Sequence, residues 1–503
     1  MARLAFALSF ACGALAGCSL IVDKGETQCS TDSDCEHFGG HPYCQQGVCV
    51  DSGLGPPGCF FGTPSDGSDF ADQCTVSQTF QYDNCKNLQL CDATSLSNAM
   101  SVGSAPGSAN SGKVAAPQNP EPTPTILCSD LPSMGIATNV MYITGSTNLP
   151  PLVKAVQPLL YAQSPSYVAV FDPQTSCAGA ASIYVGGSAS ILLDVANSYA
   201  FYYDTSGNQQ FCSLGSAGEP VDVGESDVYP STCSTTYTSS SIADYTGPVQ
   251  AITFVVPSGS TQRSISAEAA HLVFAAGGNS VVMPWNVPLY YFVRSSGTGT
   301  IQLPSKEIAT MPTAWWGFDR LSAGNLVESM EATPPANAES AIGVLSNDFA
   351  DRSRANLTVL AFQQQGQIYG YLPDSSSTSL DKMNVRDGHY PIWGQIHLLA
   401  SVSGGQPSQA AAALVTQFTV PKLDQTLVTA IIQSGFTPTC AMQVSHTAEV
   451  GALSVYQPPF GCSCYFDATT GSTLPSECAT CGADLPQCPS TRPACNYGYC
   501  EVQ

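Results

Sequence analysis

The pattern of apolar and polar residues divides the chain into a long central part and two cysteine-rich ends. From about Ile126 to Tyr456, strand-like runs alternate with helix-like runs, which is typical of an α/β domain. Strands are predicted at 166–172, 250–256 and 356–362, where β-branched and aromatic residues gather. A helix is predicted to begin after Ser266 as its N-cap and to end at the two glycines 277 and 278.

The stretch MYITGSTNLPPLVKAV, residues 141–156, predicts a strand, a short loop and a helix. Two prolines suit the first helical turn, where their missing N–H groups would have no intrahelical partner. The apolar residues fall at i, i+3, i+4 and i+7 and form one helix face: Leu149, Leu152, Val153 and Val156. The loop before the helix directs free N–H groups and the hydroxyls of Ser146 and Thr147 outward. It is either one wall of an anion site or only a well-capped helix.

A second junction of this kind lies at 290–308, where YYFV is followed by Arg294-Ser-Ser-Gly-Thr298 and then by a predicted helix that includes Ile301 and Ile308. A guanidinium, hydroxyls and a glycine that permits close backbone approach all precede the helix. This combination favours anion binding by Arg294 over a solvated surface arginine.

The cysteines gather at the two ends of the chain. We expect a Cys-rich N-terminal module at 18–95, a Ser/Ala/Pro-rich linker at 96–125, an α/β domain at 126–456 and a Cys-rich C-terminal module at 457–503. Residues 41–50 and 492–501 share the pattern x-Pro-x-Cys-x-x-Gly-x-Cys, which suggests a duplicated small module. Cys478 and Cys481 form a C-x-x-C pair, interpreted as structural disulfides rather than a zinc or redox site, so no metal is expected.

The N-terminus carries an arginine, an apolar run and small residues, which is typical of a secretory signal peptide over residues 1–17. Leu15-Ala-Gly-Cys18 resembles the bacterial lipobox, which implies lipidation of Cys18, and the non-Asp residue Ser19 then implies sorting to the outer membrane. Of 22 cysteines, Cys12 leaves with the signal and Cys18 takes the lipid. The remaining even number fits disulfides in an oxidising compartment.

Charge and motifs exclude several functions. The net charge of −23 argues against nucleic-acid binding, because phosphate backbones need a basic surface. Ser379-x-x-Lys382 lacks the companion motifs of penicillin-binding enzymes and is interpreted as a polar loop. We therefore expect no enzyme and no cofactor.

The ordered motifs of the central part resemble the substrate-binding proteins of phosphate ABC importers, which have the type 2 periplasmic-binding fold. The similar segments cover the central two thirds of the chain: ITGSTNLPPLVKAV, SCAGA at 176–180, VGESDVY at 223–229, the Arg294 to Thr298 loop, ESAIGVLSND at 339–348 and NVRDGHYPIWGQIHL at 384–398. The resemblance implies two lobes around a cleft. It places these residues in the cleft: Ser146, Thr147, Ser176, Asp227, Arg294, Ser296, Gly297 and Thr298.

In that site Asp227 would act only as an acceptor, and would favour protonated phosphate over sulfate. The alternative role of Asp227 is to cap a turn. The chain departs from the family pattern at Ser295, where Asp is common, at Cys177, where Gly is common, and in a strand-rich insertion at 191–220 whose Cys212 is a candidate partner of Cys233. Another oxyanion, or no ligand, therefore stays open.

These observations predict a lipid-anchored solute-binding protein of the bacterial envelope that captures phosphate or a similar oxyanion between two lobes. Its expected partners are that anion and the membrane that holds the lipid on Cys18. The alternative is an outer-membrane or cell-surface lipoprotein that reuses the fold for interaction or structure, with an envelope protein as its partner and without a role in transport.

Overall fold

The structure is a computed structural model of the 503-residue chain. It describes residues 43–45, 48–50, 124, 126–186, 191–192, 200–277, 282–472, 474–482 and 487–502. The predicted signal peptide, Cys18, almost all of the linker and most of the N-terminal module lie outside these residues. Of the helices in the described part, none combines the length and the apolar character that crossing a membrane requires.

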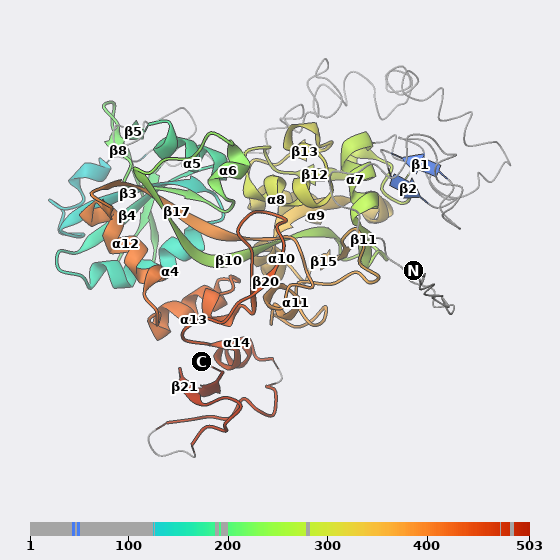
Figure 1. The fold of residues 1–503 in the computed structure, drawn as a ribbon. Helices are drawn as coiled ribbons and strands as arrows, with labels where there is room; N and C mark the ends of the chain where they lie inside the picture. Colours follow the sequence, from blue (N-terminus) through green and yellow to red (C-terminus); the bar gives the residue numbers. More distant parts are fainter. Residues whose placement is uncertain are drawn as a thin grey trace, which may run out of the picture.

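A large mixed sheet organises the central part (Figure 1). Its strand order is β13-β12-β14-β10-β17-β9-β3-β4-β6-β7, with β15 paired to β10 and β18 paired to β17. Neighbours β3 and β4 run parallel, whereas β10 and β17 run antiparallel. The α/β fold predicted from the sequence is therefore confirmed. The strands of the sheet are β3 (Asn139–Ser146), β4 (Tyr167–Gln174), β6 (Ala200–Tyr203), β7 (Gln209–Cys212), β9 (Val223–Ser226), β10 (Ile242–Pro257), β12 (Tyr291–Val293), β13 (Phe318–Asp319), β14 (Ile342–Ser346), β15 (Leu357–Val359), β17 (Trp393–Ser403) and β18 (Gln406–Pro407).

The two largest hydrophobic cores lie on different parts of this sheet and mark two lobes. The N-terminal part of β10, up to Ala251, pairs with β17, and the rest of β10 pairs with β14 and β15. One core packs β3, β4 and β17 against the first lobe's helices, and another packs the end of β10 and β12 against the second lobe's helices. Figure 1 shows the lobes on either side, with β10 and β17 running between them.

The helices cover both lobes. The first lobe has α4 (Pro150–Tyr161), α5 (Ser176–Tyr184), α6 (Pro230–Cys233), α12 (Gln409–Thr419) and α13 (Gln425–Gln433). The second lobe has α7 (Ala267–Ala276), α8 (Gly299–Glu307), α9 (Ala323–Glu331), α10 (Asn347–Arg352) and α11 (Met383–Arg386). Helix α14 (Ser463–Thr469) lies in the segment predicted to form the C-terminal module. Short 3₁₀ turns are η3 (Cys128–Asp130), η6 (Pro288–Tyr290), η7 (Pro312–Ala314), η8 (Pro335–Ser340) and η9 (Thr439–Ala441).

The local signals of two predicted helices are confirmed. Ser266 accepts a hydrogen bond from the N–H of Ala269 and caps α7, which ends at Gly277 with φ of +61°. The predicted apolar face of α4 is buried along its whole length. Helix α8 ends at Glu307, so Ile308 follows the helix instead of belonging to it.

The structure pairs all twelve cysteines from Cys128 onward: 128–212, 177–233, 440–462, 464–478, 481–495 and 488–500. The suggested Cys212–Cys233 pair is wrong. Residues 126–128 run beside Ser213, which brings Cys128 to Cys212, while α6 packs on α5 and brings Cys233 to Cys177. The disulfide interpretation of the C-x-x-C pair is confirmed, because Cys478 and Cys481 each bond to a cysteine outside the motif.

The repeated cysteine pattern forms the same hairpin at both ends of the chain. Strands β1 (Tyr43–Gln45) and β2 (Val48–Val50) pair with Cys44 opposite Cys49, and β21 (Ala494–Asn496) and β22 (Tyr499–Glu501) pair with Cys495 opposite Cys500. In the second hairpin both turn residues have positive φ, as a two-residue type I′ turn requires.

The remaining strands are β5 (Ile191–Leu192), β8 (Glu219–Pro220), β11 (Ser264–Ser266), β16 (Ala361–Gln363), β19 (Val444–Ser445) and β20 (Ser454–Val455).

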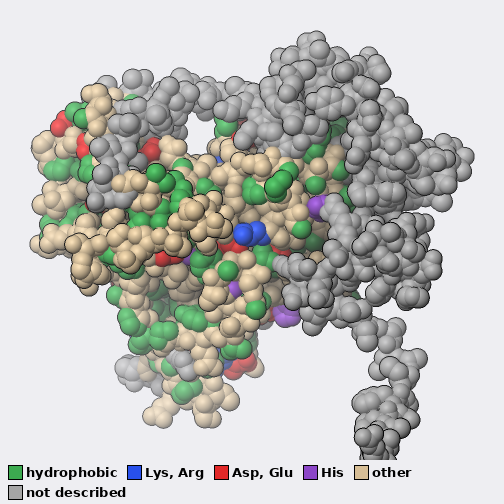
Figure 2. All heavy atoms as spheres, turned by 45° about the horizontal axis from the view of Figure 1, so that its top comes forward, with side chains coloured by type: hydrophobic (Ala, Val, Ile, Leu, Met, Phe, Trp, Pro, Cys, Tyr) green, Lys and Arg blue, Asp and Glu red, His purple; other side chains and the backbone are tan. Residues whose placement is uncertain are grey.

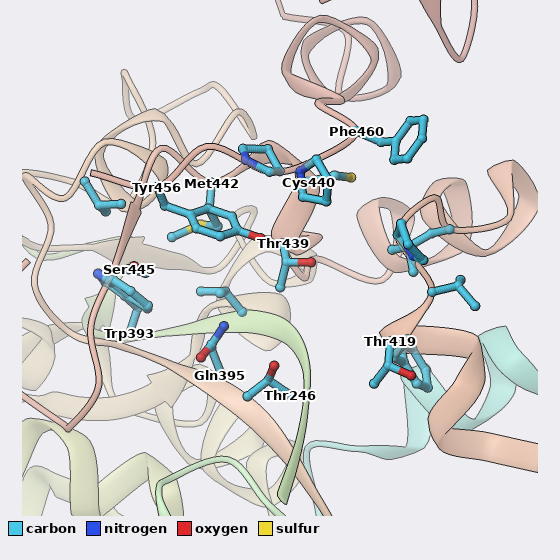
Figure 3. A pocket seen from close by; sticks show the side chains of 18 residues that line it. Thr246, Trp393, Gln395, Thr419, Thr439, Cys440, Met442, Ser445, Tyr456 and Phe460 are labelled. Carbon is cyan, nitrogen blue, oxygen red and sulfur yellow. The ribbon is translucent and has the colours of Figure 1, made fainter. Parts of the chain in front are cut away.

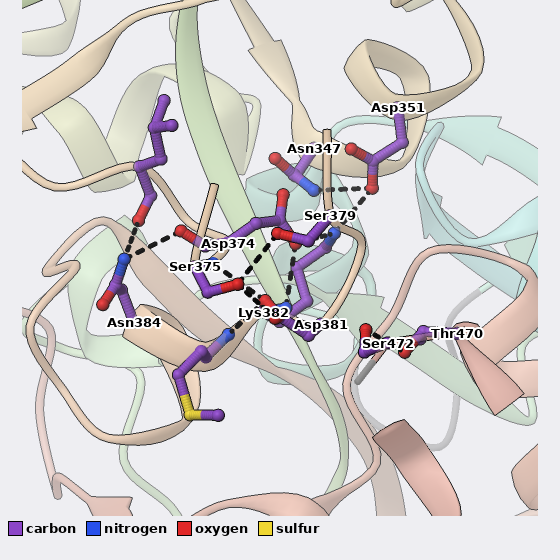
Figure 4. A network of polar contacts seen from close by, with 12 residues as sticks. Asn347, Asp351, Asp374, Ser375, Ser379, Asp381, Lys382, Asn384, Thr470 and Ser472 are labelled. Carbon is purple, nitrogen blue, oxygen red and sulfur yellow. Dashed lines mark hydrogen bonds and ion pairs between the residues drawn. The ribbon is translucent and has the colours of Figure 1, made fainter. Parts of the chain in front are cut away.

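Charged side chains are sparse on the face of the described residues in Figure 2, in keeping with a charged content of 11%. Several charges instead form a buried cluster, drawn in Figure 4. The ammonium group of Lys382 lies 2.8 Å from a carboxylate oxygen of Asp351 and 2.8 Å from one of Asp374. The Ser379 hydroxyl forms hydrogen bonds with the hydroxyls of Ser375 and Ser376, whereas Lys382 forms ion pairs with the two aspartates. This arrangement supports the polar-loop interpretation of Ser379-x-x-Lys382.

Candidate functional site

Asp227 lies at the centre of the contact between the lobes. It follows β9 and is fully buried. Its carboxylate accepts hydrogen bonds from the Ser146 hydroxyl at 3.0 Å, from the Asn148 amide at 2.9 Å and from the Ser176 hydroxyl. These donors come from the end of β3, from the loop before α4 and from the start of α5. A carboxylate has about four acceptor positions, so Asp227 has room for one more donor.

Helix α8 brings the second lobe to the same place. The N–H of Gly299 donates to the Ser176 hydroxyl at 2.8 Å, and the N–H of Cys177 donates to the Gly297 carbonyl at 3.0 Å. A Cβ atom on Gly299 would lie 2.4 Å from a carboxylate oxygen of Asp227. Only glycine allows the helix to approach this closely. The N-termini of α5 and α8 therefore meet at one buried polar centre.

Arg294 follows β12 and is 1% exposed. One terminal nitrogen, Nη2, donates to the Thr147 hydroxyl at 3.0 Å and to the Leu321 carbonyl at 2.8 Å. The other two nitrogens, Nε and Nη1, have no hydrogen-bond partner among the described residues. Burial lowers the pKa of the Arg294 guanidinium, and the carboxylates of Asp319 and Asp227 oppose this shift. An arginine remains charged even so, which leaves a buried cation with two unused donors.

Glu225 adds a second buried carboxyl two residues before Asp227. Its Oε2 atom accepts from the N–H of Ser146 at 2.6 Å, while Oε1 has no partner among the described residues. Burial and the nearby Asp227 raise the pKa of Glu225 well above its usual value. The site therefore favours the neutral, protonated form of Glu225. Asp227 and Arg294 are then the principal acidic and basic groups of the site.

The structure brings most of the predicted residues together. Ser146 and Ser176 both contact Asp227, and Thr147 contacts Arg294. Thr298 is the N-cap residue of α8, but its hydroxyl donates to the Ser295 carbonyl within its own loop.

Among the described residues, the hydrogen bonds of Ser296 and Gly297 to their neighbours are made by backbone carbonyls, which accept from Gln302 and Cys177. Helix α8 begins at Gly299, so the residues that extend from this loop into the site are Gly299 and Thr300. Sequence reasoning missed these two, together with Asn148, Glu225 and Gln250. The second Gly-Thr pair of SSGTGT was the one available signal for Gly299 and Thr300.

Asn148 connects the lobes through its amide. Its nitrogen donates to Asp227, and it lies 3.1 Å from the Gln250 carbonyl oxygen and 3.4 Å from the Thr300 hydroxyl. Its own carbonyl oxygen lies 3.4 Å from the Ser346 hydroxyl. Gln250 belongs to the crossing strand β10, and Thr300 and Ser346 belong to the second lobe. The Asn148 side chain therefore joins the first lobe to β10 and to the second lobe through hydrogen-bonding groups.

The Gly299→Ala variant is expected to lower the free energy of unfolding by about 1–3 kcal/mol, because the added methyl group overlaps Asp227. The matched control is Gly324→Ala in α9, where a Cβ atom has its nearest neighbour at 3.9 Å. There the better helix propensity of alanine predicts no loss. Urea unfolding of both variants measures the difference. Equal stabilities would mean that α8 does not need this close approach.

Solved structures similar to this chain include several phosphate-binding proteins. One is a phosphate ABC transporter substrate-binding protein with bound phosphate from Clostridium perfringens, 11% identical, with a TM-score of 0.40, covering 60% of this chain and all of its own length. Another is an ABC-type phosphate transport receptor from Vibrio cholerae, 12% identical, with a TM-score of 0.39, covering 59% of this chain and 99% of its own. A human phosphate-binding apolipoprotein is 14% identical, with a TM-score of 0.39, covering 64% and 99%. No protein-family model and no curated protein matches the sequence. The family that the sequence motifs resemble is thus among the solved structures that match the chain.

Proposed function

We propose that the chain is a solute-binding protein that encloses phosphate or a similar small oxyanion between its two lobes. The observation that carries this proposal is Arg294, a fully buried cation with two nitrogens that no described residue satisfies. Leaving such donors unmet is costly, and an oxyanion supplies acceptors and a compensating charge together. The N-termini of α5 and α8 meet near Asp227 and add positive potential there.

Asp227 gives the site a basis for selectivity. Its carboxylate repels a fully ionised anion but can accept a hydrogen bond from a protonated one. Three intramolecular donors already contact Asp227, which leaves room for about one more. Phosphate near neutral pH carries such a proton, whereas sulfate does not. We therefore expect phosphate to bind more tightly than sulfate.

The N-terminal sequence supports anchoring of this binding protein to a bacterial membrane. The lipobox-like Leu15-Ala-Gly-Cys18 would place a lipid on Cys18, and Ser19 favours the outer membrane. Metabolic labelling with a fatty acid, compared between the wild type and Cys18→Ser, tests this part. Equal labelling of both would contradict the anchor.

Calorimetry on a soluble form that begins after Cys18 tests anion binding. Phosphate is expected to bind the wild type, and Asp227→Asn is expected to narrow the preference for phosphate over sulfate, since an amide can also donate. Arg294→Met is expected to abolish binding. Arg263→Met, which changes an exposed arginine of the same lobe, is the matched control. Melting temperatures separate lost binding from lost folding. No heat from either anion with the folded wild type would overturn the proposal.

One observation favours the alternative function, an interaction or structural lipoprotein that reuses the fold. The hydroxyls of Ser146 and Ser176 already donate to Asp227, so groups of the chain itself occupy acceptor positions that a ligand would otherwise use. In this alternative, Asp227 acts as an internal bridge between the lobes. Asp227→Asn would then lower the melting temperature, and calorimetry would detect binding of neither anion to the wild type.

A further inference from the structure

A cavity lies away from the candidate anion site, where the segment 439–460 passes over β10 and β17 (Figure 3). It has a volume of about 330 Å³, within the range of small-molecule sites. Strands β10 and β17 form one side through Thr246 and Gln395. The end of α12 and the segment that includes Thr439 and Tyr456 form the rest. The cavity is therefore built mainly from elements of the first lobe and from the chain that leads to the C-terminal module.

The lining of this cavity is uncharged. Among the described residues that line it, none is Asp, Glu, Lys, Arg or His. An ion that entered would lose hydration without gaining a counter-charge, and that loss is large. The cavity therefore selects against charged ligands, in contrast to the site around Arg294.

Several polar side chains of the cavity have no partner. In the described part of the chain, the hydroxyls of Thr246, Thr439 and Tyr456 and the amide of Gln395 make no hydrogen bond to protein groups. In Figure 3 Gln395 and Thr246 lie beside the strands, while Tyr456 and Thr439 lie on the opposite side. Together they offer donors and acceptors to a ligand from two directions.

The remaining wall is apolar and held in place. Phe460 and the prolines 458 and 459 supply flat or compact apolar surface, while Trp393 and Met442 line the cavity but are each only 3% exposed. The disulfide Cys440–Cys462 ties the start of the segment to α14, and the tryptophan packs against His446 with ring centroids 4.0 Å apart. A site on strands and a cross-linked segment keeps its shape, which reduces the cost of binding.

We propose that this cavity binds a neutral saccharide. A pyranose ring is uncharged, carries hydroxyls around its edge and presents C–H groups on its faces. The hydroxyls match the unpartnered amide and hydroxyl groups, and the C–H faces match the aromatic and proline wall. This site is independent of the proposed anion site and uses none of its residues.

Calorimetry and saturation-transfer NMR on the soluble chain test the saccharide site with two neutral disaccharides, maltose and diacetylchitobiose. At least one is expected to bind with a dissociation constant of about 1 mM or lower. Gln395→Ala and Tyr456→Ala are each expected to weaken binding about tenfold, through lost hydrogen bonds and lost ring contact. Gln425→Ala, on the exposed start of α13, is the matched control and should bind as the wild type does.

Three further results distinguish the alternatives. Digalacturonic acid, which is acidic, should bind more weakly than the neutral disaccharide, because its carboxylates would lack a counter-charge. Arg294→Met should abolish phosphate binding and leave saccharide binding unchanged, so the two proposals fail separately. The proposal is overturned if neither neutral disaccharide binds. It is also overturned if both cavity variants bind as the wild type does.

Discussion

Replacing Arg386 with methionine is expected to lower the free energy of unfolding by about 3–5 kcal/mol, because it leaves a buried carboxylate without its partner. Arg386 is 1% exposed and forms an ion pair with Asp467 of α14. Its guanidinium also donates to the carbonyls of Ala441 at 3.1 Å and Asp381 at 3.2 Å, and it lies over the Phe466 ring at 4.8 Å. One side chain therefore connects α11 to α14.

Urea unfolding, monitored by tryptophan fluorescence, measures this loss. Asp467→Asn should also destabilise the protein, since the guanidinium would then lack its counter-charge, whereas Arg263→Met at an exposed site should cost less than about 1 kcal/mol. The double variant Arg386→Met with Asp467→Leu should recover much of the loss, because an apolar pair of similar size avoids the desolvation of charges. A loss below about 1 kcal/mol for Arg386→Met would contradict this assignment.

Helices and turns could be predicted where the determining residues are neighbours in sequence. Ser266 caps α7 through a hydrogen bond only three residues away, and the apolar face of α4 repeats within two turns. The hairpin of β21 and β22 is local in the same sense, since Gly498 supplies the turn conformation close to both strands. In each case the free energy depends on contacts within about one or two helical turns or one hairpin.

The contacts that complete the candidate site depend on residues far apart in the chain. Asn148 meets Thr300 across 152 positions, and Gly299 must be a glycine only because Asp227 lies behind it. Neither relation leaves a local pattern. The disulfides fail for the same reason: a spacing cannot tell that residues 126–128 run beside Ser213, which decides the partner of Cys212. Long-range packing, rather than propensity, sets these details.

Glu449 is the buried group with the clearest expected effect on pH dependence. It lies between β19 and β20, and its Oε1 atom accepts from the N–H of Tyr229 at 2.7 Å. Its Oε2 atom has no partner in the described part of the chain. Burial raises the pKa of Glu449 to about 7. The hydrogen bond from Tyr229 and the charges of His397 and Lys306 oppose this rise, and Asp227 adds to it.

The contribution of Glu449 to stability should therefore fall as pH rises. Between its unfolded pKa of 4.5 and its folded pKa of about 7, the folded protein binds more of this proton than the unfolded chain does. The stabilisation is complete below pH 4.5 and is lost as pH rises through about 7, by about 3 kcal/mol in total.

Glu449→Gln isolates this effect, because the amide still accepts from Tyr229 but does not titrate. Titrating groups that do not interact with Glu449 cancel in the comparison, including His446, whose pKa is lowered by burial. The free energy of unfolding of the wild type minus that of the variant, measured in urea from pH 4.5 to pH 8, should fall by about 3 kcal/mol. Glu268→Gln, at an exposed position in α7, should show no such trend. A constant difference for Glu449→Gln would mean that the carboxyl ionises in the folded protein as easily as in the unfolded chain. The segment 446–453 would then have to admit water to Glu449.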